Sequence, residues 1–328
     1  MSLSSALTSS DSGGIVCRMT TEQRWTAEHI PDLSGRIFVV TGASSGLGRV
    51  TAQALAGRGG RVVLAVRDEE KGRRVVAETT ARQPGAALEV RRLDLADLDS
   101  VRRFADALHA DHPQVDVLVN NAGVMAPPRS LSAQGHELQF AANHLGHFAL
   151  TGLLLDLLTA GTDPRVVTVT SANHRLGRLH FDDIDGERRY APMRFYNQSK
   201  FANAVFGCEF QRRLTAAGSP VRSLLAHPGY AATNLQTSGP VGLVKVLFGR
   251  VLTPFAQPAE RGALPQLYAA TAQDVEGGAF LGPDGPAELR GGPTRVRLSR
   301  AATDPETGRR LWDLSEQLTG VAYGLPAA

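Results

Sequence analysis

Short apolar segments and longer amphipathic segments alternate along most of the chain. The short segments are rich in β-branched residues and apolar on both faces, as strands buried beneath two helix layers require. The predicted strands are Ile37–Thr41, Arg61–Val66, Ala87–Leu93, Val115–Asn120, Arg165–Ser171, Val221–Ala226 and one near Ala279–Leu281. The predicted helices are Gly46–Ala56, Glu69–Ala81, Leu98–Ala110, Glu137–Leu158 and Phe195–Ala217. This alternation predicts an α/β fold with a doubly wound parallel sheet of about seven strands and helices on both faces.

The segment Gln236–Ala256 departs from the alternation. It holds an apolar stretch that Lys245 and Arg250 interrupt and that is too short to span a bilayer. The sequence therefore predicts one or two short helices here. We expect them to form a lid over a substrate cleft, with no integral membrane segment.

The two ends of the chain differ from its middle. Residues 1–18 are rich in serine and glycine and lack the apolar core of a secretory signal, so we expect a flexible tail. Near the other end, Asp304–Leu318 predicts a terminal helix with Trp312 packed inward. Because no linker or internal repeat separates the elements, residues 19–328 are expected to form a single Rossmann-type domain.

Composition narrows the class of protein. The 328 residues are 42% hydrophobic, enough for a sizeable core. The net charge is +3, and the basic residues are spread along the chain without a basic tract, which argues against a nucleic-acid partner. Cys17 and Cys208 lie far apart and match neither a disulfide framework nor a zinc site. We therefore expect no metal and a cytoplasmic location.

A glycine-rich turn follows the first predicted strand and opens a helix. Its sequence is Thr41-Gly42-Ala43-Ser44-Ser45-Gly46-Leu47-Gly48. Glycines allow a sharp turn and a close backbone approach to a pyrophosphate, which then rests on helix N-terminal amides. The spacing Gly-x-x-x-Gly-x-Gly differs from the dinucleotide fingerprint Gly-x-Gly-x-x-Gly. The turn predicts a phosphate site, and a glycine turn without a ligand is the alternative.

The residue after the second strand bears on the choice of cofactor. An acidic side chain at this place favours NAD, and an arginine favours NADP. Arg67 occupies it, and its guanidinium can pair with a 2′-phosphate through two charge-assisted hydrogen bonds. The acidic residues 68–70 that follow are interpreted as the first turn of a helix, where carboxylates meet the dipole favourably. The sequence thus predicts NADP(H), with NAD(H) as the alternative.

A tyrosine and a lysine four residues apart predict carbonyl chemistry. Reduction by a nicotinamide needs a proton donor and a stabilised oxyanion. Tyr196 and Lys200 lie on one face of a predicted helix, and a nearby ammonium favours the phenolate. Such a pair occurs often by chance on exposed helices. This chain has only three lysines, Lys71, Lys200 and Lys245, so a chance pairing of a tyrosine with a lysine is rarer here.

Taken together, these motifs resemble the short-chain dehydrogenase/reductase family, whose glycine motif is Thr-Gly-x-x-x-Gly-x-Gly. The resemblance implies that Tyr196, Lys200, Ser171 and Asn143 are catalytic. In that family the serine polarises the substrate oxygen, the asparagine anchors a water of the proton relay, and the lysine also holds the nicotinamide ribose. Ser171 is preferred over Thr170 because the motif's serine comes last in its strand.

The resemblance also implies a set of cofactor contacts. Asp94 and Leu95 match the adenine contact, the run Asn120–Gly123 matches the Asn-Asn-Ala-Gly motif, and Pro228 begins Pro-Gly-x-x-x-Thr at the nicotinamide carboxamide. Asn120 fits a structural tie between strands as well as a cofactor contact. The expected contacts are Gly42, Ser44, Ser45, Gly46, Leu47, Gly48, Arg67, Asp94, Leu95, Asn121, Ala122, Gly123, Tyr196, Lys200, Pro228, Gly229 and Thr233.

Three features resemble the retinol-dehydrogenase-like and protochlorophyllide-reductase-like branch. They are the long insert 172–194, the pattern Ala-x-Arg-Asp-x-x-Lys-Gly at 65–72, and Asn-His-Leu-Gly at 143–146. The resemblance implies an NADP(H)-dependent oxidoreductase that interconverts a carbonyl and an alcohol on a bulky, mainly apolar substrate, as a ketoreductase or aldehyde reductase. The alternatives are an alcohol dehydrogenase working in the oxidative direction and a non-catalytic cofactor-bound sensor or scaffold.

Two further expectations concern contacts. His174, just beyond Ser171, is a candidate for substrate contact. By analogy with the family, a homodimer or homotetramer would form through the helices Glu137–Leu158 and Phe195–Ala217. The expected partner is otherwise a small hydrophobic molecule.

Overall fold

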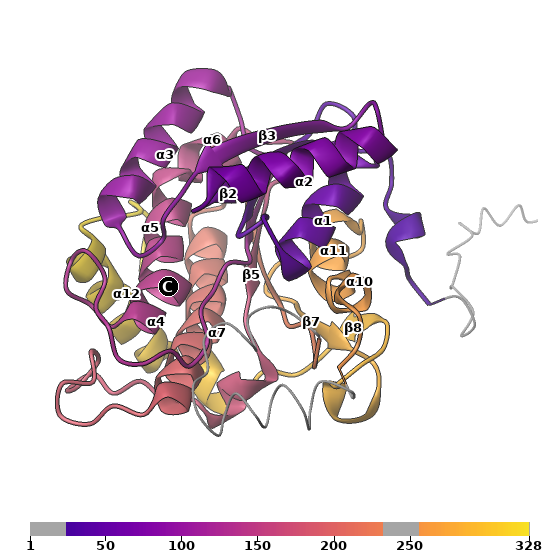
Figure 1. Cartoon of the computed structure of the whole chain (residues 1–328). Coiled ribbons are helices and arrows are strands. Elements are labelled where there is room, and N and C mark those ends of the chain that lie inside the picture. Colours follow the sequence, from indigo (N-terminus) through magenta and orange to yellow (C-terminus); the bar gives the residue numbers. More distant parts are fainter. Residues whose placement is uncertain (1–23, 232–255, 328) are drawn as a thin grey trace, which may run out of the picture.

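An eight-stranded sheet forms the centre of the molecule. The computed structural model describes residues 24–231 and 256–327 (Figure 1). The strand order is β3-β2-β1-β4-β5-β6-β7-β8; the first seven are parallel, and β8 runs antiparallel to β7. The strands are β1 Ile37–Thr41, β2 Arg61–Val66, β3 Ala87–Arg92, β4 Val117–Asn120, β5 Arg165–Val169, β6 Arg222–Ala226, β7 Phe280–Pro283 and β8 Pro293–Arg295. The predicted doubly wound α/β fold is confirmed, with one more strand than expected.

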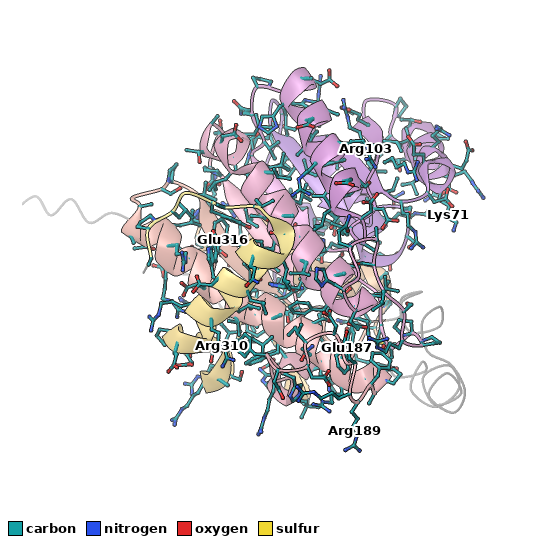
Figure 2. All side chains as sticks on the ribbon, turned by 90° about the vertical axis from the view of Figure 1, so that its left-hand side faces the viewer. Lys71, Arg103, Glu187, Arg189, Arg310 and Glu316 are labelled. Carbon is teal, nitrogen blue, oxygen red and sulfur yellow. The ribbon has the colours of Figure 1, made fainter. Side chains whose placement is uncertain are left out.

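Helices cover both faces of the sheet. The α-helices are α1 Gly46–Ala56, α2 Glu69–Arg82, α3 Leu98–Asp111, α4 Leu138–Phe140, α5 Gly146–Leu153, α6 Leu155–Thr159, α7 Pro192–Ala216, α10 Ala259–Gly262, α11 Leu264–Thr271 and α12 Pro305–Thr319. Short 3-10 turns are η1 Ala27–His29, η3 Ala172–Leu176, η6 Pro286–Glu288 and η7 Arg300–Thr303, and η2 Ala141–Leu145 is a π-helical turn. Charged side chains such as Lys71, Arg103 and Arg310 cover the outer surfaces of these helices (Figure 2).

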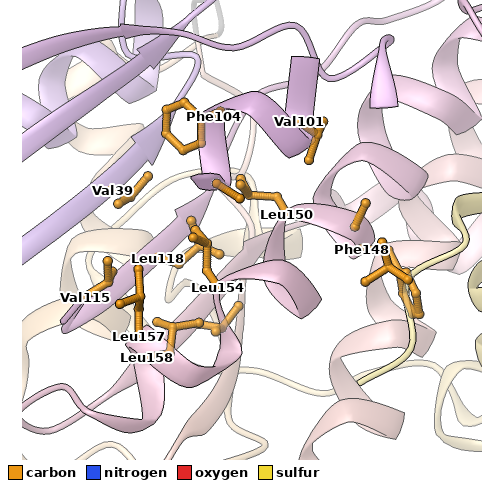
Figure 3. Close-up of a cluster of buried hydrophobic side chains, with 14 of the residues drawn as sticks. Val39, Val101, Phe104, Val115, Leu118, Phe148, Leu150, Leu154, Leu157 and Leu158 are labelled. Carbon is orange, nitrogen blue, oxygen red and sulfur yellow. The ribbon is translucent and has the colours of Figure 1, made fainter. Parts of the chain in front are cut away.

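The two faces of the sheet support two separate hydrophobic cores. In β1, Val39 points into a core built with α3, α5, α6, α7 and α12 (Figure 3). Its neighbours Phe38 and Val40 point into the other core, built with α1, α2 and α11. Successive strand residues face opposite sides, so a strand between two helix layers must be apolar throughout. Burial of one such side chain is worth about 1.5–3 kcal/mol.

The structure corrects several predicted boundaries. The strand expected over Arg165–Ser171 ends at Val169, and Ser171 instead caps η3. The single helix expected over Glu137–Leu158 is divided into α4, the π turn η2, α5 and α6. The terminal helix is present, and Trp312 is 2% exposed, as expected.

Two predicted regions lie outside the described residues: the tail 1–18 and nearly all of the lid 236–256. Among the described helices, none is both long and apolar enough to cross a membrane.

Candidate active site

The predicted site residues follow the carboxyl ends of the parallel strands. Gly42 comes after β1, Arg67 after β2, Asn121 after β4, Ser171 just beyond β5 and Pro228 beyond β6. Because these strands are parallel and neighbours in the sheet, their carboxyl ends share one edge. This edge is where open α/β sheets bind their ligands.

The glycine turn has the geometry that a phosphate site needs. Gly42 and Gly46 have φ angles of 69° and 53°, in the left-handed region that favours glycine. A Cβ on Gly48 would lie 2.5 Å from Nδ2 of Asn121 and 2.6 Å from the carbonyl oxygen of Gly42. Ser45 precedes α1, and its side chain makes no capping hydrogen bond to the helix amides. These amides are therefore available to an anion, and the turn fits a pyrophosphate.

Hydrogen bonds join this turn to the segment after β4. Oγ1 of Thr41 accepts hydrogen bonds from the backbone amides of Asn121 and Ala122, each at 2.9 Å. Nδ2 of Asn121 donates to the carbonyl oxygen of Thr41 at 2.8 Å. Asn120, in contrast, is fully buried, and its Nδ2 donates to Oγ1 of Thr151 in α5 at 3.0 Å. Asn120 thus ties β4 to α5 rather than to a neighbouring strand, and its Oδ1 has no hydrogen-bond partner within the described residues.

Arg67 lies where its guanidinium is uncommitted. It is exposed, and no hydrogen bond or ion pair joins its side chain to any residue of the described ranges. Asp68 caps α2 by accepting a hydrogen bond from the amide of Lys71 at 3.1 Å, as expected for the acidic run. Arg92, which the sequence analysis did not single out, pairs with Val66 at the end of β3 and is also exposed. Two exposed arginines thus lie at the ends of neighbouring strands, where the adenosine end of the site is predicted.

Asp94 and Leu95 follow β3 at the same edge. The carboxylate of Asp94 accepts a hydrogen bond from the amide of Ala96 at 3.0 Å, and the amide of Asp94 donates to Oγ of Ser100 at 3.0 Å. Leu95 is 8% exposed and belongs to the same hydrophobic core as Val39. A Cβ on Gly146 would lie 2.3 Å from the carbonyl oxygen of Leu95, so α5 packs closely against this turn.

Tyr196 and Lys200 lie in the first turns of α7. Pro192 begins the helix. Tyr196 and Lys200 are four residues apart and both lie on its buried side, where their exposed fractions are 5% and 3%. Burial raises the pKa of Tyr196 to about 12, and the nearby Ser171 hydroxyl opposes part of this rise. The phenol therefore lies near the hydroxyl group of the serine predicted to act beside it.

The ammonium group of Lys200 lies against the end of β5. Its Nζ donates to the carbonyl oxygen of Val169 at 3.1 Å. Burial lowers the pKa of Lys200 to about 8. The spacing of the two residues predicts that Lys200 lowers the pKa of Tyr196, whereas in the protein alone desolvation of the phenolate dominates and raises this pKa. A protonated phenol at neutral pH suits a proton donor.

Asn143 lies in the π-helical turn η2 and is fully buried. Its side chain is fully engaged: Oδ1 accepts from the amide of Val124 at 2.7 Å, and Nδ2 donates to the carbonyl oxygen of Val124 and to Oγ of Ser199, both at 2.9 Å. A Cβ on Gly123 would lie 3.1 Å from Oδ1 of Asn143 and 3.6 Å from Nζ of Lys200. π-helical turns occur frequently at functional sites. The side chain of Asn143 is thus committed to Val124 and Ser199, and its main-chain carbonyl oxygen lies 3.0 Å from Nδ1 of His147.

The segment after β6 turns at a glycine. Gly229 has a φ of 64°, and a Cβ there would lie 2.4 Å from the carbonyl oxygen of Leu289. Pro228 is held by Gln257, whose Nε2 donates to the carbonyl oxygen of Pro228 at 2.7 Å. Thr233 lies outside the described residues.

The expectation that His174 contacts substrate is not supported by its position. His174 is fully buried, with Nδ1 2.8 Å from the carbonyl oxygen of Ser171 and its ring packed edge-on against Phe280. It lies beneath the Ser171 turn and supports it. Within the described ranges, no group of His, Cys, Asp and Glu residues could hold a metal ion.

The class of protein follows from comparison with known families. The family model described as short chain dehydrogenase matches residues 36–240, and the chain belongs to this family of oxidoreductases. Mouse retinol dehydrogenase 12 is 36% identical over 293 residues, covering 89% of this chain and 88% of that protein. Mouse polyprenol dehydrogenase is 40% identical over 303 residues, covering 90% and 87%. The chain is therefore placed in the retinol-dehydrogenase-like branch, as the insert and the Asn-His-Leu-Gly run suggested.

Two solved structures are similar to this chain in fold. An uncharacterized protein from Mycobacterium paratuberculosis is 47% identical with a TM-score of 0.77, covering 92% of this chain and all of that one. A short chain dehydrogenase from Shigella flexneri, solved in complex with NADP, is 25% identical with a TM-score of 0.57, covering 73% and 93%.

Proposed function

We propose that the protein is an NADP(H)-dependent oxidoreductase that reduces the carbonyl group of a bulky, mainly apolar ketone or aldehyde to an alcohol. The observation that carries the proposal is the buried Tyr196 phenol, which lies close enough to the Ser171 hydroxyl for that group to lower its pKa and which is one helical turn from Lys200. A proton donor beside a second hydroxyl is the arrangement that carbonyl reduction needs.

Each group of the site has a part in this reaction. When bound, the nicotinamide supplies the hydride. Tyr196 donates its proton to the substrate oxygen, and the Ser171 hydroxyl donates a hydrogen bond to the same atom. Lys200, whose Nζ donates to the carbonyl oxygen of Val169, supplies positive charge one helical turn from Tyr196. Asn143 fixes the segment after β4 through its two hydrogen bonds with Val124.

NADP(H) is favoured because Arg67 has no protein partner within the described chain. A solvated guanidinium beside the ribose can pair with a 2′-phosphate at little cost, since no existing ion pair must be broken. The similar structure from Shigella flexneri that holds NADP supports this choice.

An apolar substrate is favoured by the surroundings of Tyr196. Its ring packs in a small cluster with Met125, Ala126 and Met193. Methionine side chains are flexible and adapt to apolar ligands of irregular shape. The names of two relatives refer to retinol and polyprenol, both apolar alcohols.

A second candidate is oxidation of such an alcohol. The names of the relatives favour this direction, because both are called dehydrogenases. The same tyrosine serves as base in one direction and acid in the other. The protonated phenol, whose pKa burial raises to about 12, is the form that acts as the acid in reduction, while the ratio of reduced to oxidised cofactor sets the direction of net turnover.

The proposal is tested by following NADPH oxidation with a set of long-chain apolar aldehydes and ketones, and NADP⁺ reduction with the matching alcohols. Tyr196→Phe should bind NADPH normally and lose at least about 100-fold in kcat, the scale of general acid catalysis. Tyr268→Phe, a surface change on α11, is the control and should keep full activity. Tight NADPH binding without turnover of any compound would instead favour a sensor. Near-normal rates in Tyr196→Phe would show that another group donates the proton.

A further inference from the structure

The segment before β8 holds two adjacent non-glycine residues in the left-handed region. Ala287 has φ 51° and ψ 24°, and Glu288 has φ 56°. This conformation is costly for a residue with a Cβ and persists only where the surroundings fix it. Such positions cluster at functional sites, so the contacts of Glu288 call for an explanation.

The carboxylate of Glu288 joins two cationic or polar side chains from distant parts of the chain. One terminal nitrogen of Arg175 donates to both carboxylate oxygens at 2.8 Å. Nε2 of His227 lies 3.0 Å from Oε2. The His227 ring is fully buried and the Glu288 side chain is 24% exposed, so this interaction is only partly screened by solvent.

The hydrogen bonds of His227 fix which nitrogen carries its proton. The amide of Gly229 donates to Nδ1 at 3.3 Å, so Nδ1 must offer a lone pair. In the neutral ring Nε2 then carries the hydrogen and donates it to Glu288. Burial lowers the pKa of His227, although Glu288 opposes the shift.

Glu288 therefore connects the two halves of the proposed site. Arg175 belongs to η3, the turn that Ser171 caps. His227 directly precedes Pro228 and Gly229. The next residue, Leu289, accepts a hydrogen bond from the amide of Tyr230 at 2.8 Å. One short segment thus contacts the serine turn on one side and the loop after β6 on the other.

We propose that Glu288 is a positioning residue, which holds the loop 227–230 against the Ser171 turn so that a nicotinamide ring on that loop faces the substrate oxygen. This inference rests on the proposed function. It assigns a role to the Gly- and Pro-rich region after β7, whose sequence pattern alone gave none. Glu288 touches neither the reacting atoms nor the cofactor in this arrangement and acts through His227 and Arg175.

The test compares binding of the whole cofactor with binding of its adenosine half. In Glu288→Gln the side chain has one accepting oxygen instead of two, so it cannot keep all the hydrogen bonds from Arg175 and His227. The loop should therefore loosen. The Kd for NADPH should rise about fivefold, the effect of one ordinary hydrogen bond, while the Kd for 2′,5′-ADP stays within about twofold. The kcat with the best carbonyl substrate should fall about tenfold, because small misplacements of reacting groups are costly.

Matched variants separate this role from general instability. Glu276→Gln removes a carboxylate of the same region whose ion pair with Arg295 is exposed, and it should leave all three measurements unchanged. Arg175→Gln should reproduce the effect of Glu288→Gln, and the double variant should lose little more than either single one. Glu288→Asp should recover part of the NADPH affinity.

The outcomes are distinguishable. Unchanged NADPH binding in Glu288→Gln would overturn the inference, and so would an equal weakening of NADPH and 2′,5′-ADP, which would indicate a global effect on the fold. If the wild-type protein binds neither ligand, it is the proposed function that fails.

Discussion

Nε2 of His147, in α5, lies 2.9 Å from Oγ1 of Thr41, the last residue of β1. Nδ1 of the same ring lies 3.0 Å from the carbonyl oxygen of Asn143, which can only accept, so Nδ1 carries the hydrogen in the neutral ring. Nε2 then accepts from Thr41, whose oxygen accepts two amides from the segment after β4. A chain of hydrogen bonds thus links the glycine turn, the β4 segment and the π turn.

Acid should unfold the protein through its buried histidines. Burial lowers the pKa of His147 to about 4 and that of His144 to about 3, against 6.5 for an unfolded histidine. Between these values the unfolded chain binds more protons than the folded one, so stability falls as pH drops below about 6.5. His147 alone accounts for about 3 kcal/mol of this loss.

Urea unfolding at pH 7 and pH 4 measures the effect. His147→Phe should be about 1–3 kcal/mol less stable at pH 7, because it leaves partners in Thr41 and Asn143 unsatisfied, and it should lose less on acidification. His29→Phe, an exposed histidine, is the control. An unchanged pH response in His147→Phe would contradict the assigned neutral ring.

Alkaline pH should act in the opposite sense through Lys200. Its pKa is lowered by burial from 10.5 to about 8, so between these values the unfolded chain holds a proton that the folded protein has released. Stability therefore rises with pH across this range, by up to about 3 kcal/mol for the single group.

The difference between wild type and Lys200→Met isolates this contribution, since other titrating groups are common to both. In urea unfolding, the free energy of unfolding of the wild type should rise relative to that of Lys200→Met between pH 8 and pH 10. Lys71→Met, whose side chain is 60% exposed, should show no such trend. A flat difference for Lys200→Met would mean that solvent reaches the ammonium group.

Arg67 should decide the preference between the two dinucleotides. Loss of its charge-assisted hydrogen bonds in Arg67→Ala should reduce the ratio of kcat/KM for NADPH over NADH by about 10- to 100-fold. Arg61→Ala changes an exposed arginine at the opposite end of the same strand and should leave the ratio unaltered. A ratio that survives in Arg67→Ala points to Arg92 as the phosphate-binding group.

Gly48 should not tolerate a side chain. In Gly48→Ala the new Cβ would lie 2.5 Å from the Asn121 side chain and 2.6 Å from the carbonyl oxygen of Gly42. Neither group can move away without opening the phosphate turn. We expect a loss of NADPH affinity of at least about tenfold together with a lower Tm. In Gly85→Ala nothing lies within 4 Å of the new Cβ, so both properties should be kept. Fluorescence titration with NADPH and thermal melts distinguish the two variants.

Features that depend only on residues close together in the sequence could be predicted from it. The glycine turn, Arg67 after its strand, and Tyr196 four residues before Lys200 are local patterns, and the structure places them at one edge of the sheet. The break at η2 was not predicted because apolar spacing continues through it, and its contact between Asn143 and Val124 joins residues 19 positions apart.

Long-range contacts were beyond sequence reasoning. Glu288 is 113 residues from Arg175 and 61 from His227, and no local pattern joins them. β8 was missed since its three residues lie in a run of Gly, Pro and Arg without alternation, and the pairing with β7 defines it. His174 was placed near substrate from its position after Ser171, but packing against Phe280 turns it into the interior.

The two outer strands of the sheet differ in length, but both are poor templates for pairing with a further strand. β3 carries Glu89, Arg91 and Arg92, and β8 is three residues long and begins with Pro293, which has no amide hydrogen to donate. A neighbouring molecule that tried to extend the sheet would have to desolvate charges at one border and would find hardly any ladder to continue at the other. Folded copies of the chain should therefore resist joining border to border at high concentration.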